Sequence, residues 1–303
     1  MPRLYLLLFI FCVTASIANC GNGNQQVFKL DLSPLKGKVY TYSFYHVITS
    51  QFLQQSRSDT ITMEINMEVE SSQDPLGILR FTFQDLHKSE LPPAIQVARR
   101  GFPKRRIQEL KSELASKTDA IFHALKGKHV KVIVSGKGVV EKIEGAEELL
   151  SQIASDCKED KRLVGQVIHD YASENAITDH INLLFSAVPN MKVIPGENWG
   201  KDITLVTKAP ININSFYTFK ELKGDTAYLD IQSKILGGTA GNFYLKGTRS
   251  GFAIINYGSG LPYLVETRAS STTTTTEYEV RQEEHWIIML KRTDEKLLTF
   301  KHR

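Results

Sequence analysis

Histidine is the residue type that could supply metal-ligand or acid–base chemistry here, since the chain has 8 of them. Their spacing does not favour a metal site. His123 and His129 lie on either side of an expected helix end, while His169 and His180 are not on the same face of a helix. The sequence also contains no His-x-x-x-His and no Cys-x-x-Cys motif. We therefore expect neither a metal nor a cofactor.

A hydrolytic site is no better supported by the sequence. His169 precedes Asp170, and Asp179 precedes His180, but neighbouring residues on a helix point in different directions and cannot act as a pair. Ser259 lies between two glycines in an expected hairpin, which differs from the Gly-x-Ser-x-Gly turn that carries a nucleophile. An enzyme is therefore not predicted, and a hydrolase with a dispersed site is kept only as an alternative.

A basic cluster precedes the first expected helix and is the strongest local concentration of charge. Such a cluster could contact anionic lipid head groups, at about 1 kcal/mol for each basic side chain near the surface. A solvated loop or a protease-sensitive loop would give the same pattern. The basic residues are Arg99, Arg100, Lys104, Arg105 and Arg106.

The N-terminus is typical of an exported protein. Residues 4–13 are apolar, follow Arg3, and lead into small residues, so residues 1–19 are predicted to be a signal peptide. Cys20 is the predicted lipidation site, because residues 17–20 resemble a bacterial lipobox, although Asn19 departs from that pattern. The alternative is ordinary cleavage before Asn19, which would release the protein freely. Residues 20–35 would then be a flexible tether.

Two cysteines remain after the signal peptide is removed, Cys20 and Cys157. They could form a disulfide in an exported protein. If Cys20 carries lipid, Cys157 is unpaired, and the acidic residues around it would raise rather than lower the pKa of its thiol. A nucleophilic role for Cys157 is therefore not expected.

The composition fits a globular domain. The chain has 303 residues, of which 42% are hydrophobic, and a formal net charge of +4. This hydrophobic content is enough for a core, and the small charge excess gives no reason to expect nucleic acid as a partner. We expect a single domain at 36–303, with possible halves at 36–187 and 188–293.

Alternating and helical patterns predict the fold class. Residues 60–70 alternate between apolar and polar side chains, which is typical of an antiparallel strand with one buried face. Helices are expected at 104–126, 146–154 and 163–185, between two groups of strands. Glycine-containing turns at 135–138, 222–225 and 257–260 predict hairpins. We therefore expect an α+β fold in which helices cover one face of a large, curved antiparallel sheet, either single or duplicated.

Several short motifs resemble an uncharacterised family of Bacteroidota cell-envelope lipoproteins, a domain of unknown function. The motifs are Tyr-Thr-Tyr at 40–42, the hairpin around 136–138, Val-Pro at 188–189, Pro-Gly-Glu-Asn-Trp at 195–199 and Tyr-Thr-Phe at 217–219. The resemblance spans about residues 36–293. It implies a half-open barrel similar to periplasmic lipoprotein carriers, and it implies a membrane-anchored protein that faces the periplasm.

Our leading hypothesis is a non-enzymatic envelope lipoprotein that binds a lipid-like ligand in a groove between sheet and helices. A structural or assembly partner of another envelope protein is the alternative. The groove residues expected on the inner face of the sheet are Ile61, Met63, Ile65, Met67 and Trp199. The same apolar stripe would also be produced by an ordinary core.

Overall fold

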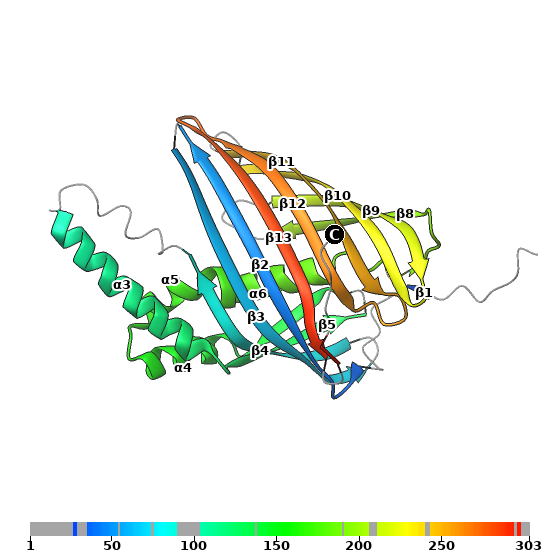
Figure 1. Ribbon diagram of the computed structural model, residues 1–303, viewed down its shortest axis with the longest axis horizontal. Helices are drawn as coiled ribbons and strands as arrows, with labels where there is room; N and C mark the ends of the chain where they lie inside the picture. Colours follow the sequence, from blue (N-terminus) through cyan, green and yellow to red (C-terminus); the bar gives the residue numbers. More distant parts are fainter. Residues whose placement is uncertain are drawn as a thin grey trace, which may run out of the picture.

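The computed structural model describes residues 27–28, 35–53, 55–73, 76–89, 104–136, 138–189, 191–205, 211–239, 243–293 and 296–297. Most of the described chain forms one large antiparallel sheet (Figure 1). Its strands follow the order β6-β5-β4-β3-β2-β13-β12-β11-β10-β9-β8, with β14 beside β13. The predicted α+β class with a curved antiparallel sheet is therefore confirmed.

Two runs of strands build the sheet, and they meet where β2 pairs with β13. The first run contains β2 (Val39–Phe52), β3 (Gln55–Gln73), β4 (Leu76–Lys88), β5 (His129–Ser135) and β6 (Val140–Glu144). The second contains β8 (Asn198–Leu205), β9 (Ile211–Lys223), β10 (Thr226–Thr239), β11 (Phe243–Asn256), β12 (Pro262–Thr274), β13 (Glu279–Thr293) and β14 (Lys296–Leu297). Both halves of the sequence thus contribute to one continuous sheet.

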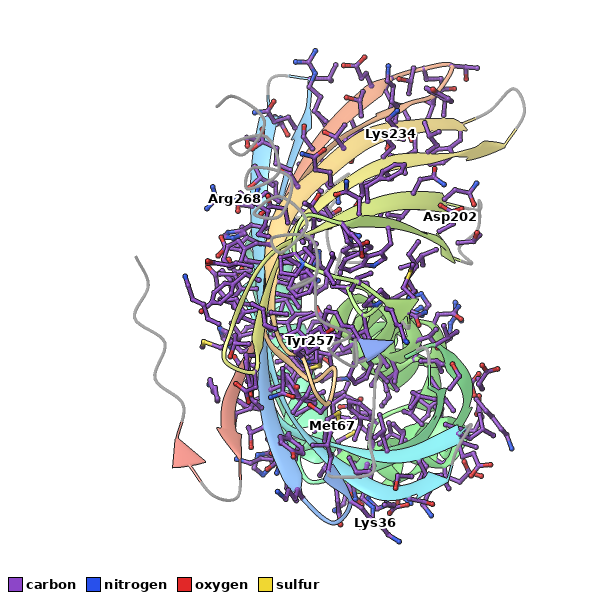
Figure 2. The ribbon with its side chains drawn as sticks, turned by 90° about the vertical axis from the view of Figure 1, so that its right-hand side faces the viewer. Lys36, Met67, Asp202, Lys234, Tyr257 and Arg268 are labelled. Carbon is purple, nitrogen blue, oxygen red and sulfur yellow. The ribbon has the colours of Figure 1, made fainter. Side chains whose placement is uncertain are left out.

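Four helices in the described part of the chain pack against the first run of strands. They are α3 (Lys104–Leu125), α4 (Ala146–Cys157), α5 (Lys161–Ala172) and α6 (Glu174–Leu184). Figure 2 shows the helices inside the lower half of the curved sheet, whereas the strands that carry Asp202 and Lys234 extend above them. None of these helices has the length and apolar character needed to cross a membrane. No described helix thus covers the concave face of the sheet at β8–β12, which is the upper half in Figure 2.

The helix predicted at 163–185 is wrong in one respect, because the structure divides it into α5 and α6. Ser173 lies between them with an extended backbone, at φ −70° and ψ 158°. Its hydroxyl accepts a hydrogen bond from the backbone N–H of Ala176 at 3.2 Å. A serine that caps the N-terminus of a helix in this way satisfies a backbone donor that a new helix would otherwise leave free.

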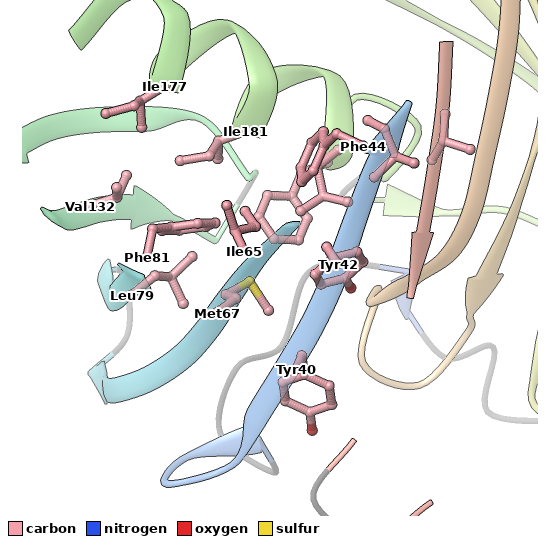
Figure 3. Close-up of a cluster of buried hydrophobic side chains, with 14 of the residues drawn as sticks. Tyr40, Tyr42, Phe44, Ile65, Met67, Leu79, Phe81, Val132, Ile177 and Ile181 are labelled. Atoms are coloured by element: carbon pink, nitrogen blue, oxygen red, sulfur yellow. The ribbon is translucent and has the colours of Figure 1, made fainter. Parts of the chain in front are cut away.

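The hydrophobic core lies between the sheet and the helices (Figure 3). Alternate residues of β2 and β3, including Tyr42 and Met67, are buried in the same core cluster as Ile177 and Ile181 of α6. The last two are four residues apart and share one helix face. Fully burying a side chain of this size contributes about 1.5–3 kcal/mol, so this packing fixes the helices against the sheet.

A short N-terminal strand, β1 (Val27–Phe28), pairs with β7 (Met191–Lys192) outside the main sheet. Phe28 is fully buried, and its ring lies 4.9 Å from that of Tyr257 between centroids. At these two residues the structure differs from the flexible tether predicted for 20–35. An apolar residue that covers an aromatic cluster explains why this part of the segment is held.

Two glycines of β11 bring its backbone unusually close to that of β12. A Cβ atom on Gly251 would lie 1.9 Å from the carbonyl oxygen of Glu266, and one on Gly247 would lie 2.7 Å from that of Ser270. Only glycine allows the two backbones to approach so closely, so a side chain at either position would force β11 and β12 apart.

Several predicted features lie outside the described residues. They include the signal peptide at 1–19, Cys20 with the tether up to residue 26, and Arg99 and Arg100 of the basic cluster. Lys104, Arg105 and Arg106 begin α3, but their side chains are not described.

Candidate functional site

The candidate site is the concave face of β8–β12 above the helices. Strand pairing aligns its inward-pointing residues into three rows that cross the sheet. We call them the donor row (Trp199, Tyr217 and Thr267), the cation row (Lys201, Ser215, Ser233 and Arg249) and the apolar row (Ile203, Ile213 and Ile235). Successive rows are two residues apart along each strand, or about 6.6 Å.

The cation row places two positive charges and two hydroxyls side by side on four neighbouring strands. Arg249 is only 9% exposed, and its Nε and Nη2 donate to the hydroxyls of Ser233 and Ser215 at 3.4 and 3.3 Å. The two serine hydroxyls are themselves 2.9 Å apart. Both contacts of Arg249 are thus long hydrogen bonds to neutral groups.

Neither cation of this row forms an ion pair with a described residue. Burial lowers the pKa of Lys201 to about 8, since it disfavours the charged form of an amine. Burial also lowers the pKa of Arg249, whereas Tyr217 and the Glu284 carboxylate act in the opposite direction. The row is therefore a partly desolvated positive patch.

The donor row contains three buried polar atoms that have no hydrogen-bond partner among the described residues. They are Nε1 of Trp199 and the hydroxyl oxygens of Tyr217 and Thr267. The rings of Trp199 and Tyr217 are stacked, 5.6 Å apart and inclined by 15°. Buried polar groups in folded proteins nearly always have a partner, so three orphans in one row mark a place where a ligand could supply acceptors.

The apolar row lies on the side of the cation row away from the donor row. Ile213 is buried, and Ile203 and Ile235 are half-buried. Leu245 on β11 adds another buried apolar side chain to the same face. This face thus offers hydrocarbon contact directly beside positive charge.

A polar cluster forms the boundary between this face and the helices. His46 is stacked on Trp286 with 3.5 Å between ring centroids, and its Nε2 lies 3.2 Å from a carboxylate oxygen of Glu284. His180 of α6 contacts Trp286, at 5.8 Å between centroids. Burial and the nearby His46 lower the pKa of His180 to about 4, so this histidine is neutral at pH 7.

The structure places the five predicted groove residues in two environments. Met63, Ile65 and Met67 belong to the continuous core, with Ile61 packed at its margin. Trp199 joins the donor row, although it also packs on the core. Four of the five thus line the packed part of the sheet, and only Trp199 reaches the candidate site.

Lys201 and Arg249 were not singled out in the sequence, although a signal was present. Arg249 stands between Gly247 and Gly251 in a strand whose alternate residues are small or apolar, and Lys201 stands between Trp199 and Ile203. A charge in an inward position of such an alternation indicates a polar group on the buried face.

Other features of the described residues give weaker indications of a functional site. No group of three or more His, Cys, Asp and Glu in this part of the chain could hold a metal ion. Cys157 is a half-buried free thiol. A shallow depression of about 310 Å³ lies on α4 and α5, beside Glu147, Ser151 and Lys161, and is open to solvent.

Two solved structures are similar to this chain, both with a TM-score below 0.5. The chain is similar to lipovitellin, described as "Lipid-protein interactions in lipovitellin", with a TM-score of 0.47 and 12% identity over 88% of this chain and 26% of that chain. It thus spans about a quarter of lipovitellin. It is also similar to OccK11 (OpdR) of Pseudomonas aeruginosa, with a TM-score of 0.20 and 6% identity over 87% of this chain and 96% of that chain. Neither similarity supports a functional argument.

Sequence comparison assigns the family. No significant match is found among curated proteins. A family model described as "Family of unknown function (DUF6263)" matches residues 106–262, from the first turn of α3 to the start of β12. This match covers more than half of the 303 residues. The chain therefore belongs to the DUF6263 family of unknown function.

Proposed function

We propose that this protein is a non-enzymatic binding protein of the cell envelope that holds a lipid-like ligand against the concave face of β8–β12. The observation that carries the proposal is the apolar row, in which Ile203 and Ile235 are only half-buried, on a face that no described helix covers. An isoleucine row of this kind is usually covered by a helix or a second sheet, because burial of apolar surface drives the packing of sheets.

The energetics favour a ligand with a long hydrocarbon chain. Each methylene removed from water contributes about 0.8 kcal/mol. About ten such groups laid along Ile203, Ile213, Ile235 and Leu245 would contribute about 8 kcal/mol before the costs of ordering are subtracted. A free energy of about 8 kcal/mol corresponds to a dissociation constant of about 1 μM, so these hydrocarbon contacts alone give at best micromolar binding.

The predicted export signal and lipid anchor belong to the same proposal. If Cys20 is lipidated, six residues at 21–26 separate it from β1, whose Phe28 is buried in the body of the protein. Six extended residues span at most about 20–22 Å. The anchor would thus keep the domain close to the periplasmic face of the membrane, where lipids are at hand. Mass spectrometry of the N-terminal peptide from membrane extracts tests this arrangement, and an unmodified Asn19 at the N-terminus would contradict it.

Neighbouring residues on β10 provide a matched test of ligand binding. Ile235 points to the concave face, whereas Leu236 is 42% exposed on the opposite face. We expect Ile235→Gln to reduce binding of a C16–C18 lipid at least tenfold, and Leu236→Gln to leave it unchanged. Fluorescence titration and native mass spectrometry would measure both. Equal effects of the two variants, or no binding by the native protein, would contradict the proposal.

A structural or assembly role is the second candidate, and the outer edge of β8 favours it. This strand pairs only with β9 among the described residues, so its other edge is open to a strand from another protein. A proline at Asp202 in β8 would disturb that edge. Loss of a co-purified envelope protein on Asp202→Pro, with lipid binding retained, would favour this role.

A further inference from the structure

We infer that the ligand is an anionic long-chain lipid whose head group is bound by Lys201 and Arg249 of the cation row. This inference rests on the proposed function and specifies its ligand class. It concerns residues of β8 and β11, which lie three strands apart and are linked across the sheet by Ser215 and Ser233.

Neither Arg249 nor Lys201 has a counterion among the described residues. Arginine stays protonated in proteins, and a buried charge is costly unless it is paired. Arg249 is 9% exposed, yet its hydrogen-bond partners among the described residues are two serine hydroxyls at 3.3 and 3.4 Å. The ammonium group of Lys201 has no hydrogen bond or ion pair with any described residue. An anion placed between the two would satisfy both charges.

The carboxylate nearest to Arg249 in the same row of the sheet is already engaged. Glu284 is separated from Arg249 by Ala269 on β12. Its two oxygens accept hydrogen bonds from Gln282 at 2.7 Å and from Trp286 at 3.1 Å, and one lies 3.2 Å from Nε2 of His46. Glu284 thus moderates the positive charge of the row from two strands away without forming an ion pair with Arg249.

The three polar groups of the donor row that lack a partner among the described residues can all donate hydrogen bonds. The indole N–H of Trp199 can only donate, and the hydroxyls of Tyr217 and Thr267 can do so. These groups occupy the row next to the two cations. A site made of cations and free donors is complementary to a group made of acceptors, such as a carboxylate or a phosphate.

The apolar row lies directly beside the cation row. Ile203 follows Lys201 on the inner face of β8, and Ile213 and Ile235 continue the row across β9 and β10. A small anion would use the charges but leave this row uncovered. An amphiphile with one anionic end would contact the cation row and the apolar row at once. A lipid therefore fits this face better than a small anion.

The experiment compares a fatty acid with its uncharged ester. The probes are cis-parinaric acid, a fluorescent C18 fatty acid, and its methyl ester, titrated at pH 7 into the full-length protein. The native protein should bind the acid at least tenfold more tightly than the ester. Arg249→Gln and Lys201→Gln should each weaken binding of the acid 10- to 100-fold and leave binding of the ester within about twofold.

Two controls separate recognition from folding. Lys234 lies next to Ser233 on β10 but faces outward and is exposed, so Lys234→Gln should bind the acid like the native protein. Arg249→Lys keeps a charge in the row and should restore part of the affinity that Arg249→Gln loses. Circular dichroism would check that each variant is folded, and Lys201→Gln on the edge strand supplies the comparison if Arg249→Gln does not fold.

The outcomes distinguish this inference from the proposed function. Equal affinity of the native protein for acid and ester would overturn the head-group assignment while leaving lipid binding intact. No binding of either probe would overturn both. Binding of acetate as tight as that of the fatty acid would show a small-anion site and would also overturn the inference.

Discussion

Lys201 and Arg249 place positive charge on a sheet face where packing alone would favour apolar side chains. Each sits between apolar or small residues of its own strand, and the pKa of each is lowered by burial. Residues that reduce stability in this way are commonly retained where they bind something. At the residue scale, the account therefore depends on the energetic cost of these charges in the free protein.

The cost at Lys201 can be measured through its pH dependence. Its pKa falls from 10.5 in the unfolded chain to about 8 in the folded one. Below pH 8 both states carry the proton and the buried charge destabilises the fold, whereas stability rises with pH between 8 and 10.5 because only the unfolded state still binds it. We expect Lys201→Met to stabilise the protein by roughly 1–3 kcal/mol at pH 7.

The additional stability of Lys201→Met over the native protein should decrease as the pH rises toward 10.5. Urea unfolding at pH 7 and pH 10 measures it, with Lys234→Met on the opposite face as the control. A Lys201→Met protein that is less stable than the native one at pH 7, or an advantage that does not depend on pH, would contradict the account. The sequence could have indicated this residue by its inward position in β8, but not its burial, which depends on β9 and the bend of the sheet.

At the scale of elements, α6 is held against the sheet by a neutral histidine. His180 contacts Phe44 and Trp286 through its ring, and His46 faces it from β2. Its pKa falls from 6.5 to about 4 in the folded state, so the unfolded chain binds the proton first as the pH decreases. Native stability from this residue is therefore present above pH 6.5 and lost as the pH falls toward 4.

We expect His180→Leu to remove about 2–3 kcal/mol of the acid-induced loss of stability between pH 6.5 and pH 4. Asp179 beside it acts in the opposite sense, since burial raises its pKa to about 6 and favours its protonated form. Asp179→Asn in the same melts separates the two effects. An unchanged pH profile in His180→Leu would count against a neutral, buried His180.

The close approach of β11 to β12 at Gly251 gives a second prediction at this scale. Gly251→Ala places a methyl group where the Glu266 carbonyl oxygen lies, 1.9 Å from the new Cβ, so the backbone must shift. Overpacking of this kind costs about 1–3 kcal/mol or more. Thermal unfolding should detect the loss, together with weaker lipid binding.

Gly165 in α5 is the matched control, since a Cβ there meets only the Leu150 side chain at 3.8 Å. Gly165→Ala should stabilise the protein by about 0.5–1 kcal/mol, because alanine favours helices over glycine. If Gly251→Ala were equally stabilising, β11 would not need glycine where it approaches Glu266.

Local patterns in the sequence predicted the elements better than the long-range arrangement. The alternation at 60–70 and the turns at 135–138 and 222–225 gave the correct strands and hairpins, because each depends on neighbouring residues. The break at Ser173 was missed because the apolar pattern continues from α5 into α6. The pairing of β2 with β13 joins residues more than 200 positions apart, and no local pattern specifies it.

Local sequence patterns also fail to specify the candidate site, because its residues come from distant strands. Trp199 was predicted as a groove residue from its motif, but its neighbours in the rows come from strands spread between residues 198 and 274. Met63 and Met67 were predicted with it because an inward stripe on one strand cannot reveal whether helices or ligand cover it. The curvature of the sheet decides this, and it places the helices on β4–β6 and leaves β8–β12 free (Figures 1 and 2).

At the scale of the whole molecule, one curved sheet serves two purposes. Its first run of strands is filled by helices and provides stability, while its second run presents the donor, cation and apolar rows. The strand β1 fixes the chain near the second run through Phe28, which packs against Trp199 at 6.5 Å between ring centroids. The N-terminal membrane anchor that we propose would therefore hold the proposed ligand-binding face, rather than the helices, near the membrane.

Photo-crosslinking tests the central claim most directly. The native protein would be irradiated with a C16 fatty acid that carries a diazirine near the end of its chain, and the labelled peptides would be identified by mass spectrometry. The account predicts labels on inward-facing residues of β8–β11, such as Ile203, Ile213, Ile235 and Leu245. Labels confined to α3–α6 or to outward-facing residues such as Leu236 and Tyr244, or the absence of light-dependent labelling, would contradict it.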